Sequence, residues 1–244
     1  MNFISKIKKA ISNNNTSSAE LKHHLKKSDD IYSMAILQPL LVEYPYLPFN
    51  GGALRPICIA YILNEIIINQ RQNILEFGSG LSTIIMARLI KKNKLNTKIV
   101  TVEHNEGWAK ILKKYLEDEN LLQFVNIVRA DLKEVKTTFG TVYWYDYYKV
   151  LNTIKGMKFD LIIIDGPPAN NPKIKYSRLP ALEKLKDNFN SDFCLVLDDV
   201  NRKGEQELVD FYKERNTDAN YTVISGTLGV FRTTDKFNPI PIHY

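Results

Sequence analysis

The acidic side chains with the clearest chemical potential stand directly after apolar runs of the sequence. Asp165 follows three isoleucines, and Asp198 and Asp199 follow the run Cys-Leu-Val-Leu. Carboxylates held close together repel one another unless a cation, an arginine or a proton compensates their charge. A hard divalent cation with oxygen ligands, Mg²⁺ or Mn²⁺, is one solution, and Arg178 or Arg202 is another. The pattern predicts acid–base chemistry, with a metal site at the three aspartates as an open alternative.

A glycine-containing loop follows the apolar run 73–77 and reads E-F-G-S-G-L-S-T from Glu76 to Thr83. Gly78 and Gly80 allow a tight turn and let a ligand approach the backbone at the N-terminus of a helix. A dinucleotide fingerprint has a third glycine three residues after the second, and that position is Thr83 here. The loop therefore predicts a nucleotide-like ligand and disfavours NAD.

Two further acids follow the next apolar runs. Glu103 comes 23 residues after Gly80, and its two coplanar oxygens could accept hydrogen bonds from both hydroxyls of a ribose. His104 beside it is expected to pack on adenine or to lie at the surface. Asp131 could accept from the amino group of adenine, or it could cap the following segment.

Alternating strand-like and helix-like segments must position these residues. Strands are expected at 73–77, 98–103, 124–128, 159–165 and 193–197, helices at 54–69, 82–92, 106–117, 180–188 and 205–214, and two closing strands at 221–224 and 229–232. Such alternation is typical of an α/β, Rossmann-like, doubly wound and mostly parallel sheet. Ligands of these sheets bind outside the carboxyl ends of the strands, where the acids stand.

An aromatic segment, T-V-Y-W-Y-D-Y-Y-K, occupies residues 141–149 between the third and fourth strands. Its five rings could stack on a sugar or on adenine. Packing of this segment onto the sheet is the favoured interpretation.

The charge of the chain is unevenly distributed. The 244 residues carry a net charge of +6, of which +5 lies in residues 1–27. The nearly neutral remainder argues against nucleic acid as a partner. We therefore divide the chain into a basic leader and helical appendage, 1–43, and a catalytic domain, 44–244. Residues 1–27 are either a solvated leader or a contact for a membrane surface or a partner, and the oligomeric state stays open.

The expected compartment is the cytoplasm. The two cysteines, Cys58 and Cys194, lie in apolar runs without metal-ligand spacing and are too few for a secreted disulfide framework. No apolar stretch reaches the length of a membrane-spanning helix, and lysines interrupt the apolar residues at the N-terminus, unlike a signal peptide.

Taken together, E-F-G-S-G, Glu103, Asp131 and I-I-D-G-P-P resemble class I S-adenosylmethionine-dependent methyltransferases over about residues 50–233. The resemblance implies a seven-stranded sheet, mostly parallel with the last strand antiparallel, and S-adenosylmethionine as cofactor. The cofactor-binding residues that it implies are Glu76, Gly78, Ser79, Gly80, Ser82, Thr83, Glu103, His104, Asp131 and Asp165.

Two narrower resemblances concern the acceptor. The pairing of Asp165 with the Asp-Asp at 198–199 is similar to metal-dependent O-methyltransferases of the catechol type, which have Asp and then Asp-Asn. The strings I-D-G-P-P, D-D-V-N-R and G-G-A-L-R-P resemble glucuronoxylan-type sugar methyltransferases and bacterial relatives associated with surface polysaccharides. The implied activity is methyl transfer to a hydroxyl of a small molecule or sugar.

Catalytic roles follow from this activity. Asp165 is the first candidate for base or metal ligand, assisted by Asp198, while Arg178 or Arg202 would bind an acidic group of the acceptor. Arg55 would meet the cofactor carboxylate. The alternatives are an NAD-dependent oxidoreductase and a non-catalytic cofactor-binding protein. Nucleic-acid methylation is disfavoured because an N/D-P-P-Y/F motif is absent.

Overall fold

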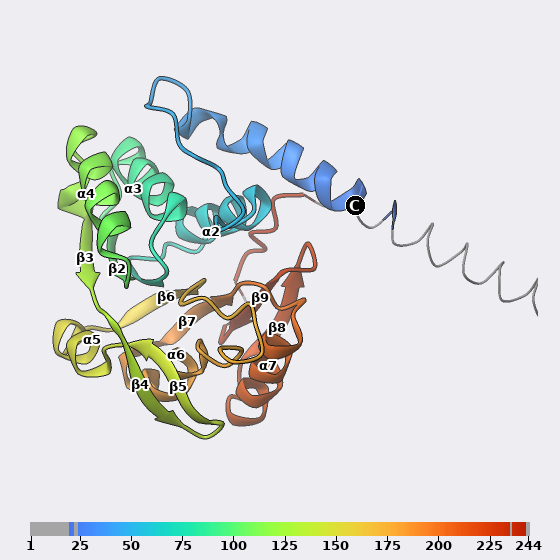
Figure 1. The fold of residues 1–244 in the computed structure, drawn as a ribbon. Coiled ribbons are helices and arrows are strands. Elements are labelled where there is room, and N and C mark those ends of the chain that lie inside the picture. The colour runs from blue at the N-terminus through green and yellow to red at the C-terminus, as the bar shows by residue number, and fades with distance from the viewer. Residues whose placement is uncertain (1–19, 22–23, 235, 243–244) are drawn as a thin grey trace, which may run out of the picture.

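The fold is a seven-stranded sheet between two layers of helices, seen in a computed structural model that describes residues 20–21, 24–234 and 236–242 (Figure 1). The strands are β1 (Asn73–Phe77), β2 (Lys98–Glu103), β3 (Val125–Arg129), β6 (Phe159–Ile164), β7 (Phe189–Leu197), β8 (Asn220–Ile224) and β9 (Leu228–Arg232). Their order is β3-β2-β1-β6-β7-β9-β8. The last strand, β9, runs antiparallel to both of its neighbours and the other pairs are parallel, so the predicted Rossmann-like sheet is confirmed.

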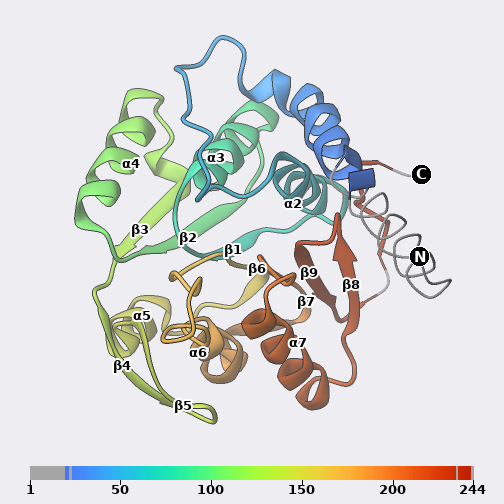
Figure 2. The same ribbon diagram turned by 45° about the vertical axis from the view of Figure 1, so that its right-hand side comes forward.

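The helices cover both faces of this sheet (Figure 2). One layer contains α2 (Pro56–Ile68), α3 (Leu81–Asn93) and α4 (Glu106–Asp118), and the other contains α5 (Tyr147–Ile154), α6 (Leu179–Lys184) and α7 (Lys203–Arg215). Short 3-10 turns occur at Gln38–Leu40, Leu122–Phe124 and Lys186–Asn188.

Strand β6 shows why its apolar run needs both layers. Leu161 and Ile163 belong to the core under α2 and α3, whereas Ile162 and Ile164 belong to the core on the opposite face. Successive side chains of a strand point to opposite faces. A strand buried on both faces is therefore apolar at every position, as parallel sheets require.

The segment between β3 and β6 differs from its prediction. It contains a separate hairpin, β4 (Leu132–Thr137) and β5 (Gly140–Tyr145), followed by α5, none of which was predicted from the sequence. The strand β4 has few apolar residues of its own, so the pairing with β5 stabilises it. The aromatic segment packs on the sheet in part, because Trp144 is buried with its ring 5.3 Å from that of Phe77, whereas Tyr143 and Tyr148 are exposed.

The N-terminal segment packs on the domain where the structure describes it. Residues 24–37 are helical, and Leu37 and Leu40 share one core with α2 and α3. Leu47, on the far side of the predicted division at residue 43, belongs to the same core. The leader residues 1–19 and 22–23 lie outside the described part of the chain. None of the described helices combines the length and the apolarity that crossing a membrane requires.

A buried arginine joins this segment to the helices. Arg88 of α3 donates to both carboxylate oxygens of Glu119, at 2.6 and 2.7 Å. The same guanidinium donates to the backbone oxygens of Leu40 and Pro45. The ion pair therefore attaches residues 40–45 to α3 and to the end of α4.

We expect Glu119→Gln to lower the free energy of unfolding by about 3–5 kcal/mol, because it leaves the buried guanidinium of Arg88 uncompensated. The measurement is equilibrium urea unfolding. Glu117→Gln is the matched control, since Glu117 is half-exposed and pairs with Lys113 in the preceding turn. The control should change stability by no more than about 1 kcal/mol, and equal effects of the two variants would contradict this role of Arg88.

Candidate active site

A cavity of about 380 Å³ lies at the carboxyl ends of the parallel strands. The glycine loop after β1 forms one wall, and residues 165–170 and 198–202 form another. Residues 51–55, which precede α2, and Thr227 of the turn between β8 and β9 also contribute, as do Glu103, His104, Tyr145 and Arg178. The cavity is where the topology of a doubly wound sheet places a ligand.

The glycine loop is held tightly between β2 and β6. Gly78 has a φ of +92°, and a Cβ at this position would lie 2.7 Å from the backbone nitrogen of Gly166. The amide of Gly78 donates to Val102, and the carbonyl of Phe77 accepts from Asp165 and Gly166. Glycine at position 78 is therefore required both by the left-handed backbone and by the close approach of β6.

Glu76 has a different environment from the one predicted. It is fully buried outside the cavity lining, and its carboxylate accepts hydrogen bonds from Ser82, Thr83 and Thr101 at 2.5–2.7 Å. Burial raises its pKa despite these hydroxyl donors. The Thr83 hydroxyl also accepts from the amide of Gly80. Glu76 and Thr83 thus shape the loop from behind, whereas Ser82 reaches the cavity.

Glu103 does line the cavity, together with His104 and Ser79. Its carboxylate accepts from the Ser79 hydroxyl at 3.0 Å and from the Asn105 amide at 2.6 Å, and the His104 ring nitrogen lies 3.2 Å away. Burial alone would raise the pKa of Glu103, but hydrogen bonding to His104, Asn105 and Ser79 lowers it overall. The site therefore holds an ionised acceptor with lone pairs left for a ligand.

Asp131 is not brought to this cavity. Its side chain is 75% exposed and pairs with Arg129 at 2.6 Å. The chain turns directly from β3 into β4. Buried Ala130 contacts the end of β2, because its backbone amide donates a hydrogen bond to the carbonyl oxygen of Glu103. The predicted adenine contact therefore has no support from the position of Asp131.

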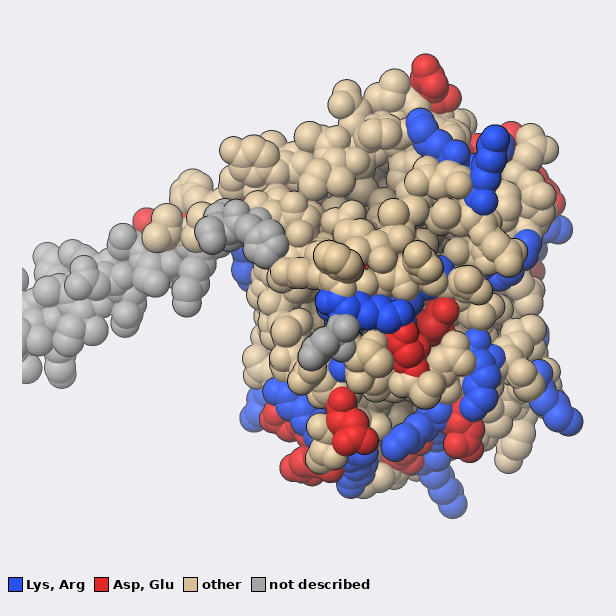
Figure 3. All heavy atoms as spheres, turned by 180° about the vertical axis from the view of Figure 1, so that it is seen from behind, with Lys and Arg blue, Asp and Glu red and all other residues tan. Residues whose placement is uncertain are grey.

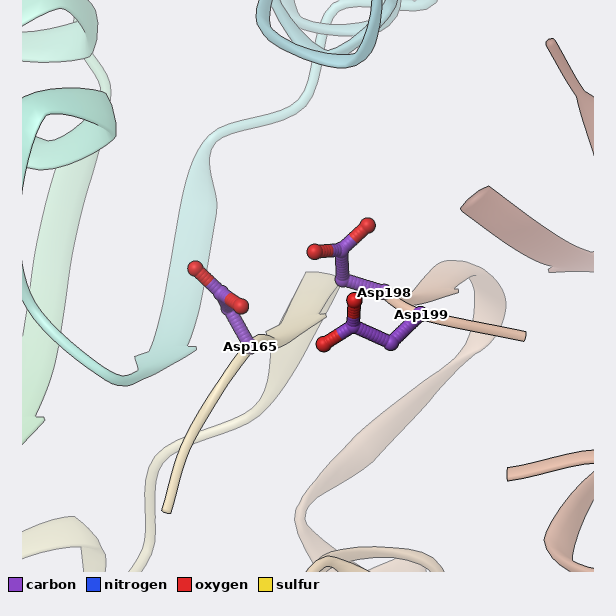
Figure 4. A group of neighbouring side chains, drawn as sticks. All are labelled: Asp165, Asp198 and Asp199. Atoms are coloured by element: carbon purple, nitrogen blue, oxygen red, sulfur yellow. The ribbon is translucent and has the colours of Figure 1, made fainter. Parts of the chain in front are cut away.

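The carboxylates of Asp165, Asp198 and Asp199 surround one space at the ends of β6 and β7 (Figure 4). One oxygen of each lies within 4.8 Å of the others. Burial and the charge of Asp198 raise the pKa of Asp165 well above its usual value, and burial together with Asp199 raises that of Asp198 to about 6. The three oxygens are arranged as a set of ligands that a hard divalent cation accepts.

Arg178 is the internal counter-ion of this cluster. Its side chain is 3% exposed, and it donates to the carboxylate of Asp199 at 3.1 Å and to the backbone oxygens of Asp165 and Asp198. It also lies 3.5 Å from buried Glu205. These contacts occupy its guanidinium, so the prediction that Arg178 binds an acidic acceptor is not supported.

Arg202 and Arg55 hold different positions. Arg202 lies at the rim, 39% exposed, and pairs with Asp199 at 2.7 Å. Arg55, predicted to meet the cofactor carboxylate, instead binds Asp30 and the backbone oxygens of Lys26 and Ser225. Although Arg55 reaches the cavity lining, its donors tie the N-terminal helix to the body.

The acids of this cluster outnumber its cations. Among the described residues, the ion pairs of Asp165, Asp199 and Glu205 are with Arg178 and Arg202, and Asp198 stands beside them. Burial also raises the pKa of Glu205, to about 7. Protons or a divalent cation would balance this excess of negative charge.

Tyr145 is a site residue that the sequence did not single out. Its ring is fully buried, yet it contributes to the cavity lining. Its hydroxyl lies against Gly166 and has no hydrogen-bond partner within the described part of the chain. The only signal in the sequence was the aromatic segment, in which nothing distinguishes Tyr145 from its neighbours.

Comparisons with solved structures show a shared fold. A SAH-bound methyltransferase from Podospora anserina is 13% identical, with a TM-score of 0.57 and coverage of 91% of this chain and 97% of the other. The O-methyltransferase TomG from Streptomyces achromogenes, in complex with SAM, is 16% identical, with a TM-score of 0.51 and coverage of 85% and 96%. A methyltransferase from Geobacter sulfurreducens is 16% identical, with a TM-score of 0.50 and coverage of 83% and 89%.

Comparisons of the sequence itself give one positive result. No curated protein matches it significantly. A family model described as a methyltransferase domain matches residues 75–200, which is more than half of the chain. The matched region runs from β1 to the end of β7 and contains the glycine loop, Glu103 and the three aspartates. The chain therefore belongs to this family of methyltransferase domains.

Proposed function

We propose that this protein transfers the methyl group of S-adenosylmethionine to a hydroxyl oxygen of a small molecule or sugar. The observation that carries the proposal is the placement of Asp165 and Asp198 on the same cavity as the glycine loop and Glu103. A group that can remove a proton thus lies beside residues suited to a nucleoside. Two of the structurally similar proteins are described with SAM or SAH bound, which supports the choice of cofactor.

The cofactor would be held by the backbone of residues 78–80 and by Glu103. Gly80 has open space where a side chain would stand, so a ligand could approach the loop closely. The ionised carboxylate of Glu103 would accept from the ribose hydroxyls. The Tyr145 hydroxyl, buried without a partner in the described structure, would donate a hydrogen bond to the same ligand. S-adenosylmethionine supplies an electrophilic methyl group on a positively charged sulfur.

The chain's own contribution to the reaction is positioning and proton removal. Holding two reactants in line can contribute on the order of 7–11 kcal/mol. An alcohol hydroxyl is a poor nucleophile until its proton is accepted by a base. Asp165 or Asp198 would accept that proton, while Arg178 keeps both strand ends in place through the backbone oxygens of these residues.

A divalent cation fits the same residues. Asp165, Asp198 and Asp199 would hold Mg²⁺ or Mn²⁺, and the ion would lower the pKa of a bound hydroxyl. Asp199 is already paired with two arginines. Asp165 and Asp198 would therefore be the principal ligands of the metal ion.

Replacement of Asp165 or Asp198 by Asn tests the catalytic proposal. Each variant should lower kcat about 10²–10⁴-fold, because the proton acceptor is lost, while the Kd for S-adenosylhomocysteine changes only a few-fold. The measurements are methyl transfer to a panel of alcohols and sugars, and calorimetric titration. Full turnover in both variants would reject these roles. Dialysis against EDTA followed by Mn²⁺ addition separates a metal requirement from direct base catalysis.

Glu103→Gln should weaken S-adenosylhomocysteine binding at least about tenfold, because hydrogen bonds to a charged acceptor contribute about 1.5–3 kcal/mol. Isothermal titration measures this directly. Glu106→Gln is the control: Glu106 is exposed and pairs with Lys110 one helical turn away, so its removal should leave the Kd unchanged. NAD should not bind the wild-type protein, and tight NAD binding would favour the oxidoreductase alternative instead.

Tyr145→Phe should raise the Kd for S-adenosylhomocysteine about two- to tenfold, the effect of one neutral hydrogen bond. Tyr212→Phe is its matched control. The Tyr212 hydroxyl is likewise buried without a partner among the described residues, but this ring packs on Phe231, away from the cavity lining. Identical binding by the wild type and Tyr145→Phe would show that the hydroxyl does not meet the cofactor.

A further inference from the structure

An unusual number of exposed apolar side chains gather on the N-terminal segment. Half of the large hydrophobic residues that are exposed in the described part of the chain lie within residues 21–46. On the helix 24–37 the most exposed are Ile31 at 71% and Tyr32 at 62%, and Leu25, Met34 and Ile36 are also exposed. A contiguous apolar helix face at the surface indicates an interaction site.

The polar contacts of this helix fix which face points outward. Asp29 accepts a hydrogen bond from Ser225, and Asp30 pairs with Arg55. Ser33 and Leu37 are fully buried on the same inner side. The two aspartates are the only acids between residues 24 and 37, so the outer face carries exposed Lys27 and apolar residues without a negative charge.

The helix lies on the outside of the α2 and α3 layer (Figure 2). Seen from behind, the upper left of the surface has few charged side chains, whereas Lys, Arg, Asp and Glu mix over the lower half (Figure 3). The exposed apolar residues of helix 24–37 therefore lie at the surface rather than under another layer of the domain.

The sequence that precedes this face is strongly basic. Residues 1–27 contain six lysines and one acid, with Phe3, Ile4, Ile7 and Ile11 between them. Like charges repel, so a net charge of +5 in each copy favours an oppositely charged partner over a second copy of the chain. An anionic bilayer satisfies both features, because it accepts apolar side chains below its headgroups and attracts lysines to its surface.

We propose that the outer face of helix 24–37 binds an anionic membrane surface. Apolar residues such as Ile31 and Tyr32 enter the interface, and Lys27 lies at the level of the headgroups. The inner face stays on the domain through Asp29, Asp30 and Leu37, so binding requires no unfolding of this helix.

Vesicle flotation with the full-length protein tests this proposal. Binding to vesicles of phosphatidylcholine with 30% phosphatidylglycerol should exceed binding to phosphatidylcholine alone by about tenfold at 0.1 M NaCl and should weaken several-fold at 0.5 M. The double variant Ile31→Ser, Tyr32→Ser should lose about tenfold in partitioning, and Lys27→Glu several-fold.

The matched control is Ile111→Ser, Tyr148→Ser. It removes the same residue types from α4 and α5, where Ile111 is 49% and Tyr148 76% exposed, and should leave vesicle binding unchanged. Three results would overturn the proposal: no binding to anionic vesicles, an equal loss in the control, or a dimer in light scattering that Ile31→Ser, Tyr32→Ser dissociates. The last result would assign the face to a second copy of the chain.

Discussion

The arrangement of the site depends on one buried guanidinium. Arg178 contacts the carboxylate of Asp199 and lies 3.5 Å from that of Glu205, and its other donors go to the backbone oxygens of Asp165 and Asp198. Taking several carboxylates out of water costs several kcal/mol per ion unless positive charge accompanies them. Arg178 supplies that charge, and its backbone bonds hold the ends of β6 and β7 together. This is why two acids can face the cavity at adjacent strand ends.

A second buried acid organises the opposite wall. Glu76 accepts hydrogen bonds from three hydroxyls behind the glycine loop, and these bonds restrain the loop without a ligand. The same Thr83 that replaces the third glycine of a dinucleotide fingerprint closes the first turn of α3 through Gly80. Preorganisation of this kind lowers the ordering cost of binding. Of the two acids on this side, Glu76 lies behind the loop and Glu103 lines the cavity.

The exposed N-terminal helix has two faces with different roles. Its inner face is fixed by Asp29 and Asp30 near the cavity mouth, while its outer face is apolar and basic. The methyltransferase fold and the proposed membrane contact thus use separate surfaces of one chain. Neither assignment depends on the other.

The sheet could be predicted because strand and helix periods are local properties of the sequence. Parallel strands buried on both faces must be apolar throughout, so I-I-I before Asp165 and L-V-L before Asp198 mark β6 and β7, and the polar residue after each marks the ligand edge. The hairpin β4–β5 was missed because β4 is largely polar and depends on its partner strand.

What the sequence determined alone was the fold class, the family and the edge of the sheet where chemistry occurs. Only the tertiary structure decided which polar groups reach the cavity. Asp131 is exposed to solvent, and Glu76 accepts hydrogen bonds from the hydroxyls around it. Arg178 pairs with the neighbouring acids, and the Tyr145 hydroxyl has no partner among the described residues. Side chains from distant segments compete for the same hydrogen-bond and ion-pair partners. Which pairs form depends on how the segments pack in three dimensions, and spacing along the chain does not give that packing.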